Sequence, residues 1–184
     1  GCSEIGAAFF DNPLLSGWVP GSVGKPFDVY KAAIFNGKKE VVAPGKNGEI
    51  GVSGYGILKG YLNDSNAFKK SMHRGYFMTG DLGYIDTDGL LHYVDRKKDL
   101  IIKAGVNISP SQIDGLLQTH PSVNEAATIG KPDPYLGETI KSFIIRKENQ
   151  AVDAKELSSF CKDELGDFFS RNLAIFGNNS GATS

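Results

Sequence analysis

The sequence predicts an α+β fold in two parts, a mostly β unit over residues 1–97 and a small α+β unit over residues 99–184. Three observations support this prediction. The 23 glycines are concentrated before residue 110, which is typical of short strands joined by tight turns. The helical signals gather after residue 110. A charged run, Asp95-Arg96-Lys97-Lys98-Asp99, separates the two regions and marks the boundary.

The composition is that of an ordinary globular protein, with 40% hydrophobic and 22% charged residues. The net charge of −1 argues against a general nucleic-acid-binding protein. No apolar run reaches the roughly 20 residues that a transmembrane helix needs. Cys2 and Cys161 lie far apart in the sequence, which favours reduced thiols and a cytoplasmic location. His73, His92 and His120 lack the spacing of zinc ligands.

The first unit is predicted to consist of strands and turns in alternation. Residues 1–26 are predicted to be irregular. A strand is predicted over residues 29–35, because Asn36-Gly37 follows it with a hairpin turn signal. Residues 49–54 predict the next strand, and residues 64–70 a short helix.

A hairpin is predicted over residues 76–94, where two apolar strands flank Asp86-Thr87-Asp88-Gly89. Two aspartates in one loop also suggest calcium, but the correctly placed glycine and the distal glutamate of an EF-hand are missing, so a plain turn is favoured. Asp81 follows a glycine in this region. A carboxylate in such a place accepts two hydroxyl hydrogens, as from a ribose, or caps a turn, and both interpretations stay open on these residues alone.

The second unit is predicted to begin with a short buried strand over residues 100–102. Ala104-Gly105 then turns the chain towards a return strand at Asn107-Ile108. Ser109-Pro110-Ser111-Gln112 is a capping box with proline at the first helical position, so a helix begins there. His120-Pro121 ends that helix.

Two strands and a second helix complete the prediction for this unit. The strands span residues 123–129 and 139–146, with a loop over residues 130–136 between them. The helix is capped by Asp153 and ends at Gly166. Its apolar stripe predicts packing against the sheet, and consists of Leu157, Phe160, Cys161 and Leu165.

The order and spacing of several motifs resemble the adenylate-forming enzymes, the superfamily of acyl-CoA synthetases, luciferases and peptide-synthetase adenylation domains. Thr-Gly-Asp, followed by the charged run and Ile-Ser-Pro, is a highly specific combination. The resemblance implies that residues 1–97 are the barrel-like end of a large AMP-binding domain and that residues 99–184 are the small mobile domain, atypical after about residue 166. The motifs are Gly1-Cys2-Ser3-Glu4, Gly48-Glu49-Ile50, Gly60-Tyr61, Thr79-Gly80-Asp81, Asp95–Asp99, Gly105–Pro110 and Ile113-Asp114.

The resemblance also implies a role for individual residues. Ser3 and Glu4 match the motif that contacts the nucleotide phosphate, and Glu4 helps to hold magnesium. Asp81 matches the acid that binds the ribose hydroxyls of ATP or AMP, and Arg96 a second ribose contact. These roles suit the side chains, because a carboxylate accepts from paired hydroxyls and a guanidinium donates in a fixed fork.

Two further positions concern the second half of the implied reaction. In the family, a carboxylic acid and ATP form an acyl-adenylate and pyrophosphate, and the thiol of CoA then displaces AMP. The small domain swings between the two halves about a hinge, which Lys98 matches. Gly105 matches a glycine that lines the pantetheine channel, where a side chain would block the thiol.

The sequence departs from the family pattern in two respects. The glycine-rich phosphate loop and most of the acyl pocket of the family are not among these residues. The family's catalytic lysine follows a Ser-Gly or Thr-Gly pair near the C-terminus, but no lysine follows Lys162 here. Such a lysine stabilises charge that develops on the transferring phosphate. The chain by itself is therefore predicted to be inactive in adenylation.

The leading hypothesis is part of an acyl-CoA ligase, of the kind that activates fatty or aryl acids in metabolism. The alternatives are an adenylation domain that loads a carrier protein and a non-catalytic interaction module. Nucleic acid is not an expected partner, because the basic residues of the 95–103 run belong to a chain of near-zero net charge. The sequence leaves the identity of the acid and the oligomeric state open.

Overall fold

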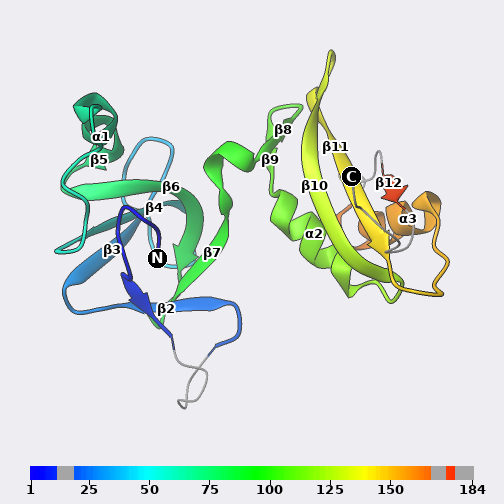
Figure 1. Ribbon diagram of the computed structural model, residues 1–184, viewed down its shortest axis with the longest axis horizontal. Helices are drawn as coiled ribbons and strands as arrows, with labels where there is room; N and C mark the ends of the chain where they lie inside the picture. The colour runs from blue at the N-terminus through cyan, green and yellow to red at the C-terminus, as the bar shows by residue number, and fades with distance from the viewer. Residues whose placement is uncertain (12–18, 167–172, 177–184) are drawn as a thin grey trace. The chain divides into compact units, whose positions relative to one another are not determined.

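The chain divides at Lys98 into two units, Gly1–Lys98 and Asp99–Ser184, in the computed structural model (Figure 1). The structure describes residues 1–11, 19–166 and 173–176. Each unit has its own sheet and its own hydrophobic core, and helices accompany the strands in both. The predicted α+β fold class is therefore confirmed.

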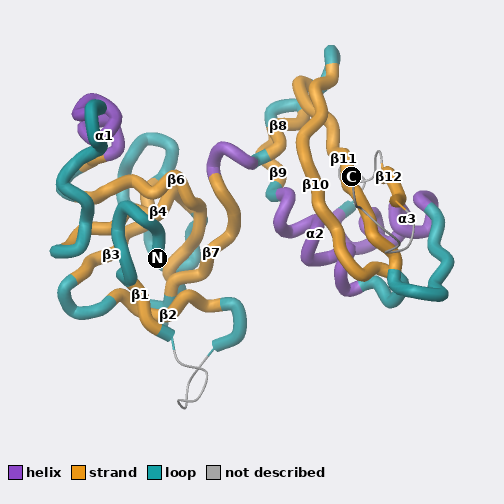
Figure 2. The backbone as a smooth tube through the Cα atoms, in the orientation of Figure 1, coloured by secondary structure: helices purple, strands orange, loops and turns teal. Residues whose placement is uncertain are grey.

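The first unit is a seven-stranded sheet that curls into a half-barrel (Figure 2). Its strand order is β1-β2-β7-β6-β4-β3, with β5 paired to β6, and all of these pairings are antiparallel. The strands are β1 (Phe9–Phe10), β2 (Ser22–Pro26), β3 (Tyr30–Phe35), β4 (Gly48–Gly54), β5 (Met72–His73), β6 (Tyr76–Ile85) and β7 (Leu91–Arg96), and one helix, α1 (Ser65–Ser71), lies between β4 and β5.

The inner face of this sheet is lined by aliphatic and aromatic side chains. Gly51 has to be a glycine, because an added Cβ would lie 2.5 Å from the ring of Phe35. The glycine therefore makes room for an aromatic side chain in the core. The buried residues are Ile5, Ala8, Ile34, Ile50, Val52, Phe77 and Leu91.

The predicted turn between β6 and β7 is confirmed. Asp86 Oδ1 accepts hydrogen bonds from the backbone N–H groups of Asp88 and Leu90, which closes the hairpin. His92 Nε2 lies 2.8 Å from Asp86 Oδ2. The hydrogen bond from His92 lowers the pKa of Asp86, and the backbone donors lower it further. Local turn chemistry therefore accounts for this aspartate.

The second unit holds a five-stranded sheet, with the order β10-β11-β8-β9 and with β12 pairing in parallel with β11. A 3₁₀ turn, η1 (Lys97–Asp99), leads into it. Its elements are β8 (Ile101–Lys103), β9 (Val106–Ile108), α2 (Pro110–Thr119), β10 (Val123–Asp133), β11 (Gly137–Arg146), α3 (Ala154–Leu165) and β12 (Leu173–Phe176).

Both predicted caps in this unit are confirmed. Ser109 Oγ accepts from the N–H of Gln112 at the start of α2, and Asp153 Oδ1 accepts from the N–H of Glu156 at the start of α3. Gly166 ends α3 with φ +82°. The two helices share a core with alternate residues of β11, so they cover one face of the sheet. This core contains Ile113, Leu117, Ile140, Ile144, Leu157 and Cys161.

Two predictions about irregular segments were wrong. Residues 1–26 were expected to be irregular, but they contain β1 and β2. β2 pairs with β7, which is far away in sequence, and β1 pairs with β2 beside Gly24. Gly24 has φ +87°, and an added Cβ would lie 1.9 Å from the carbonyl oxygen of Phe10. Residues 130–136 were expected to be a loop, but the β10–β11 ladder continues to the pair Asp133 and Gly137. Pro132 is tolerated there because β10 lies at the edge of the sheet.

None of the helices in the described part of the chain is long and apolar enough to cross a membrane.

Candidate functional site

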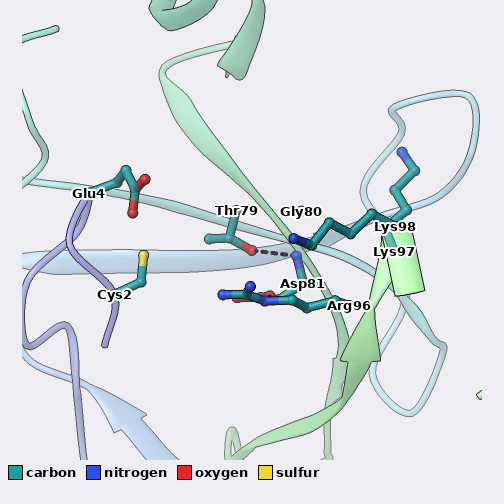
Figure 3. Close-up of a pocket in the computed structure, with 8 residues that line it drawn as sticks. All are labelled: Cys2, Glu4, Thr79, Gly80, Asp81, Arg96, Lys97 and Lys98. Carbon is teal, nitrogen blue, oxygen red and sulfur yellow. Dashed lines mark hydrogen bonds and ion pairs between the residues drawn. The ribbon is translucent and has the colours of Figure 1, made fainter. Parts of the chain in front are cut away.

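A pocket of about 430 Å³ opens in the first unit where β6 and β7 run side by side (Figure 3). It brings together four predicted site residues, Glu4, Asp81, Arg96 and Lys98. They come from the N-terminal segment, from the middle of β6, from the last residue of β7 and from the 3₁₀ turn that follows. The lining is Cys2, Glu4, Thr79, Gly80, Asp81, Arg96, Lys97 and Lys98.

Asp81 and Arg96 are placed beside each other by the register of two strands. They are direct partners in the β6–β7 ladder, and Arg96 Nε lies 3.4 Å from Asp81 Oδ1. Side chains of directly opposite residues project from the same face of a sheet. The ladder shifts its register between Leu82 and Gly83, and this irregularity places Arg96 opposite Asp81.

The backbone before Asp81 is shaped by Thr79 and Gly80. Thr79 Oγ1 donates to the carbonyl oxygen of Ile50 at 3.0 Å and accepts from the N–H of Asp81 at 3.1 Å. Gly80 has φ +77°, a conformation that favours glycine. The threonine therefore links β6 to β4. It also holds the backbone of Asp81, through the hydrogen bond drawn as a dashed line in Figure 3.

The Asp81 carboxylate is a partly desolvated acceptor. Burial raises the pKa of Asp81 above its ordinary value, the charge and hydrogen bond of Arg96 oppose this rise, and the charge of Glu4 adds to it. Arg96 is more exposed, with 53% of its side chain accessible against 24% for Asp81. A half-exposed guanidinium beside a partly buried carboxylate leaves donors on one and acceptor positions on the other for a ligand with vicinal hydroxyls.

Glu4 supplies the carboxylate on the opposite side of the pocket (Figure 3). Its Oε1 accepts from the hydroxyl of Tyr61 at 3.3 Å. In the described part of the chain no group of three or more His, Cys, Asp or Glu side chains could hold a metal ion. One carboxylate nevertheless fits magnesium that arrives with a nucleotide, because this ion is bound through one or two carboxylates together with phosphates and water.

Three basic side chains line the pocket together with two acidic ones, a local excess of one positive charge. Lys97 Nζ lies 2.8 Å from Glu49 Oε2, so this lysine is tied to β4. Lys98 is the last residue of the first unit and lies within the 3₁₀ turn. A short turn at the boundary between two units is a suitable place for a hinge.

Two predicted site residues do not line this pocket. Ser3 is exposed and lines neither it nor an adjoining apolar hollow of about 360 Å³. Gly105 belongs to the second unit, where it follows Ala104 in the β8–β9 turn. Both turn residues have positive φ, and nothing lies within 4 Å of an added Cβ at Gly105. The turn alone thus explains the glycine, and its role in a thiol channel stays a prediction.

Five residues that sequence reasoning did not assign to the site also contact it. Four line the pocket, namely Cys2, Thr79, Gly80 and Lys97, and Tyr61 donates to Glu4. Thr79 could have been found from its position two residues before Asp81, because a threonine side chain often accepts from the N–H two residues on. Tyr61 is 57 residues from Glu4, and no local signal predicts that contact.

The chain is similar to known CoA ligases and matches part of a family model. Residues 112–179 match the model of the AMP-binding enzyme C-terminal domain, so the match runs past Gly166. An oxalate–CoA ligase of Arabidopsis thaliana is 43% identical over 81% of this chain and 29% of its own length. A long-chain-fatty-acid–CoA ligase of Bacillus subtilis is 36% identical over 91% of this chain and 30% of its own length.

The fold is similar to that of solved adenylate-forming enzymes. The ATP-bound structure of MatB from Rhodopseudomonas palustris superposes with a TM-score of 0.85 at 30% identity, over 90% of this chain and 33% of that one. The chain thus spans about a third of the length of the relatives that it matches. On the combined evidence of family model, relatives and fold, the chain belongs to the adenylate-forming, AMP-binding superfamily that includes the CoA ligases.

Proposed function

We propose that the pocket of the first unit binds the ribose and phosphate of ATP or AMP, as part of an ATP-dependent carboxylate–CoA ligase. The observation that carries the proposal is the Asp81–Arg96 pair at 3.4 Å, facing Glu4 across one pocket. Asp81 accepts from the ribose hydroxyls and Arg96 donates to the same sugar. Support comes from the CoA ligases that resemble the chain and from the MatB structure, which was solved with ATP bound.

Magnesium would be held by Glu4 on this proposal, and would neutralise phosphate charge beside it. Ser3 would contact the phosphate, although its side chain is exposed in this structure. Gly105 would line the path of the CoA thiol, and Lys98 would be the pivot of the small domain. The units described above correspond, in this proposal, to the end of the large domain and to the small mobile domain.

The ribose assignment is tested by titrating the purified chain with AMP in a calorimeter. The variant is Asp81→Asn, and the matched control is Asp88→Asn, which alters an exposed aspartate of the β6–β7 turn. Hydrogen bonds to a charged group contribute about 1.5–3 kcal/mol, so we expect Asp81→Asn to weaken AMP binding at least about tenfold. Equal affinities of the two variants would contradict the assignment.

The identity of the acceptor is a separate question. CoA and a pantetheine-bearing carrier protein are titrated in parallel against the chain. We expect binding of CoA, since the relatives reported above are CoA ligases. Binding of the carrier protein alone would instead indicate a domain that loads carrier proteins.

Adenylation is a further step that the chain alone is not expected to perform. No lysine follows Lys162, and a lysine near the transferring phosphate is what the resemblance requires. Exchange of labelled pyrophosphate into ATP by the purified chain, above the background without protein, would overturn this proposal.

A further inference from the structure

The loop between β4 and α1 holds Glu4 at two points. The N–H of Leu58 donates to the Glu4 carbonyl oxygen at 2.9 Å, and the Tyr61 hydroxyl donates to Glu4 Oε1 at 3.3 Å. One contact fixes the backbone of Glu4 and the other its carboxylate. Because a glutamate loses about 1.5–2 kcal/mol of side-chain entropy when it is ordered, a partner that orders it before a ligand arrives favours binding.

The loop approaches the N-terminal segment this closely because residue 56 is a glycine. A Cβ at Gly56 would lie 1.8 Å from the Tyr30 hydroxyl oxygen, and that hydroxyl donates to the Ile5 carbonyl oxygen at 3.0 Å. Ile5 itself is buried in the core of the first unit. Ile5, the residue after Glu4, is thus fixed by the core and by Tyr30. The loop at Gly56 packs against the Tyr30 hydroxyl.

Tyr61 is itself held in place. The N–H of Asp64 donates to the Tyr61 carbonyl oxygen at 3.3 Å, and the two residues form an isolated antiparallel β-bridge. An ionised carboxylate only accepts hydrogen bonds, so the phenol is the donor to Glu4.

We propose that Tyr61 is a positioning residue for Glu4. Its hydroxyl occupies one carboxylate oxygen of Glu4 and leaves the other directed at the pocket, where it receives magnesium bound to a nucleotide. This inference rests on the proposed function of the pocket. It assigns to the Gly56–Tyr61 loop, which does not line the pocket, the task of ordering its metal-binding carboxylate.

The first test compares nucleotide binding with and without magnesium. Tyr61→Phe removes only the hydroxyl, and Tyr55→Phe is the matched control because Tyr55 is 95% exposed. The wild-type chain and both variants are titrated with ATP in magnesium and with ATP in EDTA. We expect Tyr61→Phe to bind magnesium-ATP about tenfold more weakly and to bind ATP in EDTA like the control. Equal losses under both conditions, or no loss, would overturn the inference.

The second test needs no nucleotide. The free energy of unfolding in urea is measured for the wild-type chain, Tyr61→Phe, Glu4→Ala and the double variant. We expect the double variant to lose less than the sum of the two single losses, because both substitutions break the same contact. Additive losses would refute the Tyr61–Glu4 contact. If the wild-type chain bound no ATP in either solution, the proposed function would fail, whereas non-additive losses would still support the contact.

Discussion

Arg96 lies directly across the β6–β7 ladder from Asp81, with its Nε 3.4 Å from Asp81 Oδ1. The two residues are 15 positions apart in sequence. The turn at Asp86–Gly89 and the register shift between Leu82 and Gly83 together bring them opposite each other. An exposed ion pair of this kind stabilises a fold by only about 0–1 kcal/mol. The pair therefore contributes little to the stability of the fold, and its proposed role is to bind the ribose.

Substitution of Arg96 should raise the pH below which AMP binding is lost. The charge of Arg96 lowers the pKa of Asp81 against the effect of burial, so Arg96→Gln raises that pKa further. Protonated Asp81 is a poorer acceptor, and the pH below which AMP binding is lost should therefore move upward. Calorimetric titrations over a pH series measure this, with the exposed Lys31→Gln as control. If AMP binding by Arg96→Gln were lost at the same pH as in the wild type, the prediction would be contradicted.

Asp81→Asn should make the fold more stable at neutral pH. The pKa of Asp81 is raised on folding, so the folded state binds more protons than the unfolded state in the window between the two pKa values. Stability falls as pH rises through that window, and the ionised carboxylate remains unfavourable above it. Thermal melting at pH 7 should give Asp81→Asn a higher Tm than the wild type, together with weakened AMP binding. A lower Tm would indicate that Asp81 supports the fold.

Asp86→Asn should weaken the fold at neutral pH and not in acid. An asparagine still accepts from Asp88 and Leu90, but it lacks the charged oxygen that accepts from His92. The pKa of Asp86 is lowered on folding, so its contribution is present above its ordinary pKa and is lost as pH falls through the lowered value. Melting curves of variant and wild type should therefore converge as the solution is acidified. The control is Asp88→Asn, and a constant difference across pH would contradict the prediction.

Leu117→Ala tests whether the pocket depends on the core of the second unit. Leu117 is fully buried between α2 and the sheet, so truncation should lower the free energy of unfolding by about 2–5 kcal/mol. The pocket lining belongs to residues 1–98, and AMP affinity should stay within twofold of wild type. Urea unfolding and AMP titration measure the two effects. Leu62→Ala, which alters a side chain 92% exposed, is the control.

Much of the fold could be predicted because its signals are local. The capping box at Ser109, the Asp153 cap and the Asp86–Gly89 turn each depend on side chains bonded to nearby backbone groups. The strands β1 and β2 could not be predicted, because β2 pairs with β7 about 70 residues away. Residues 130–136 were predicted to be a loop, but the ladder of β10 with β11 extends through residues 130–133.

For the candidate site, too, some residues could be predicted from the sequence and others could not. Motif order identified Glu4, Asp81, Arg96 and Lys98, and the structure brings them to one pocket. The support around them could not be predicted, since Tyr61 reaches Glu4 across 57 residues and Thr79 bridges to Ile50 across 29. Both contacts join residues that are distant in sequence, so no local signal predicts them.

The 3₁₀ turn Lys97–Asp99 follows Arg96 without an intervening residue. A ligand that immobilises the Arg96 side chain therefore acts one peptide bond away from the segment in which the chain would pivot. Hydrogen–deuterium exchange of the amides from Asp95 to Asp99 should slow when AMP is bound. The ribose of the nucleotide, besides being bound by Asp81 and Arg96, would then regulate how freely the Lys97–Asp99 segment bends.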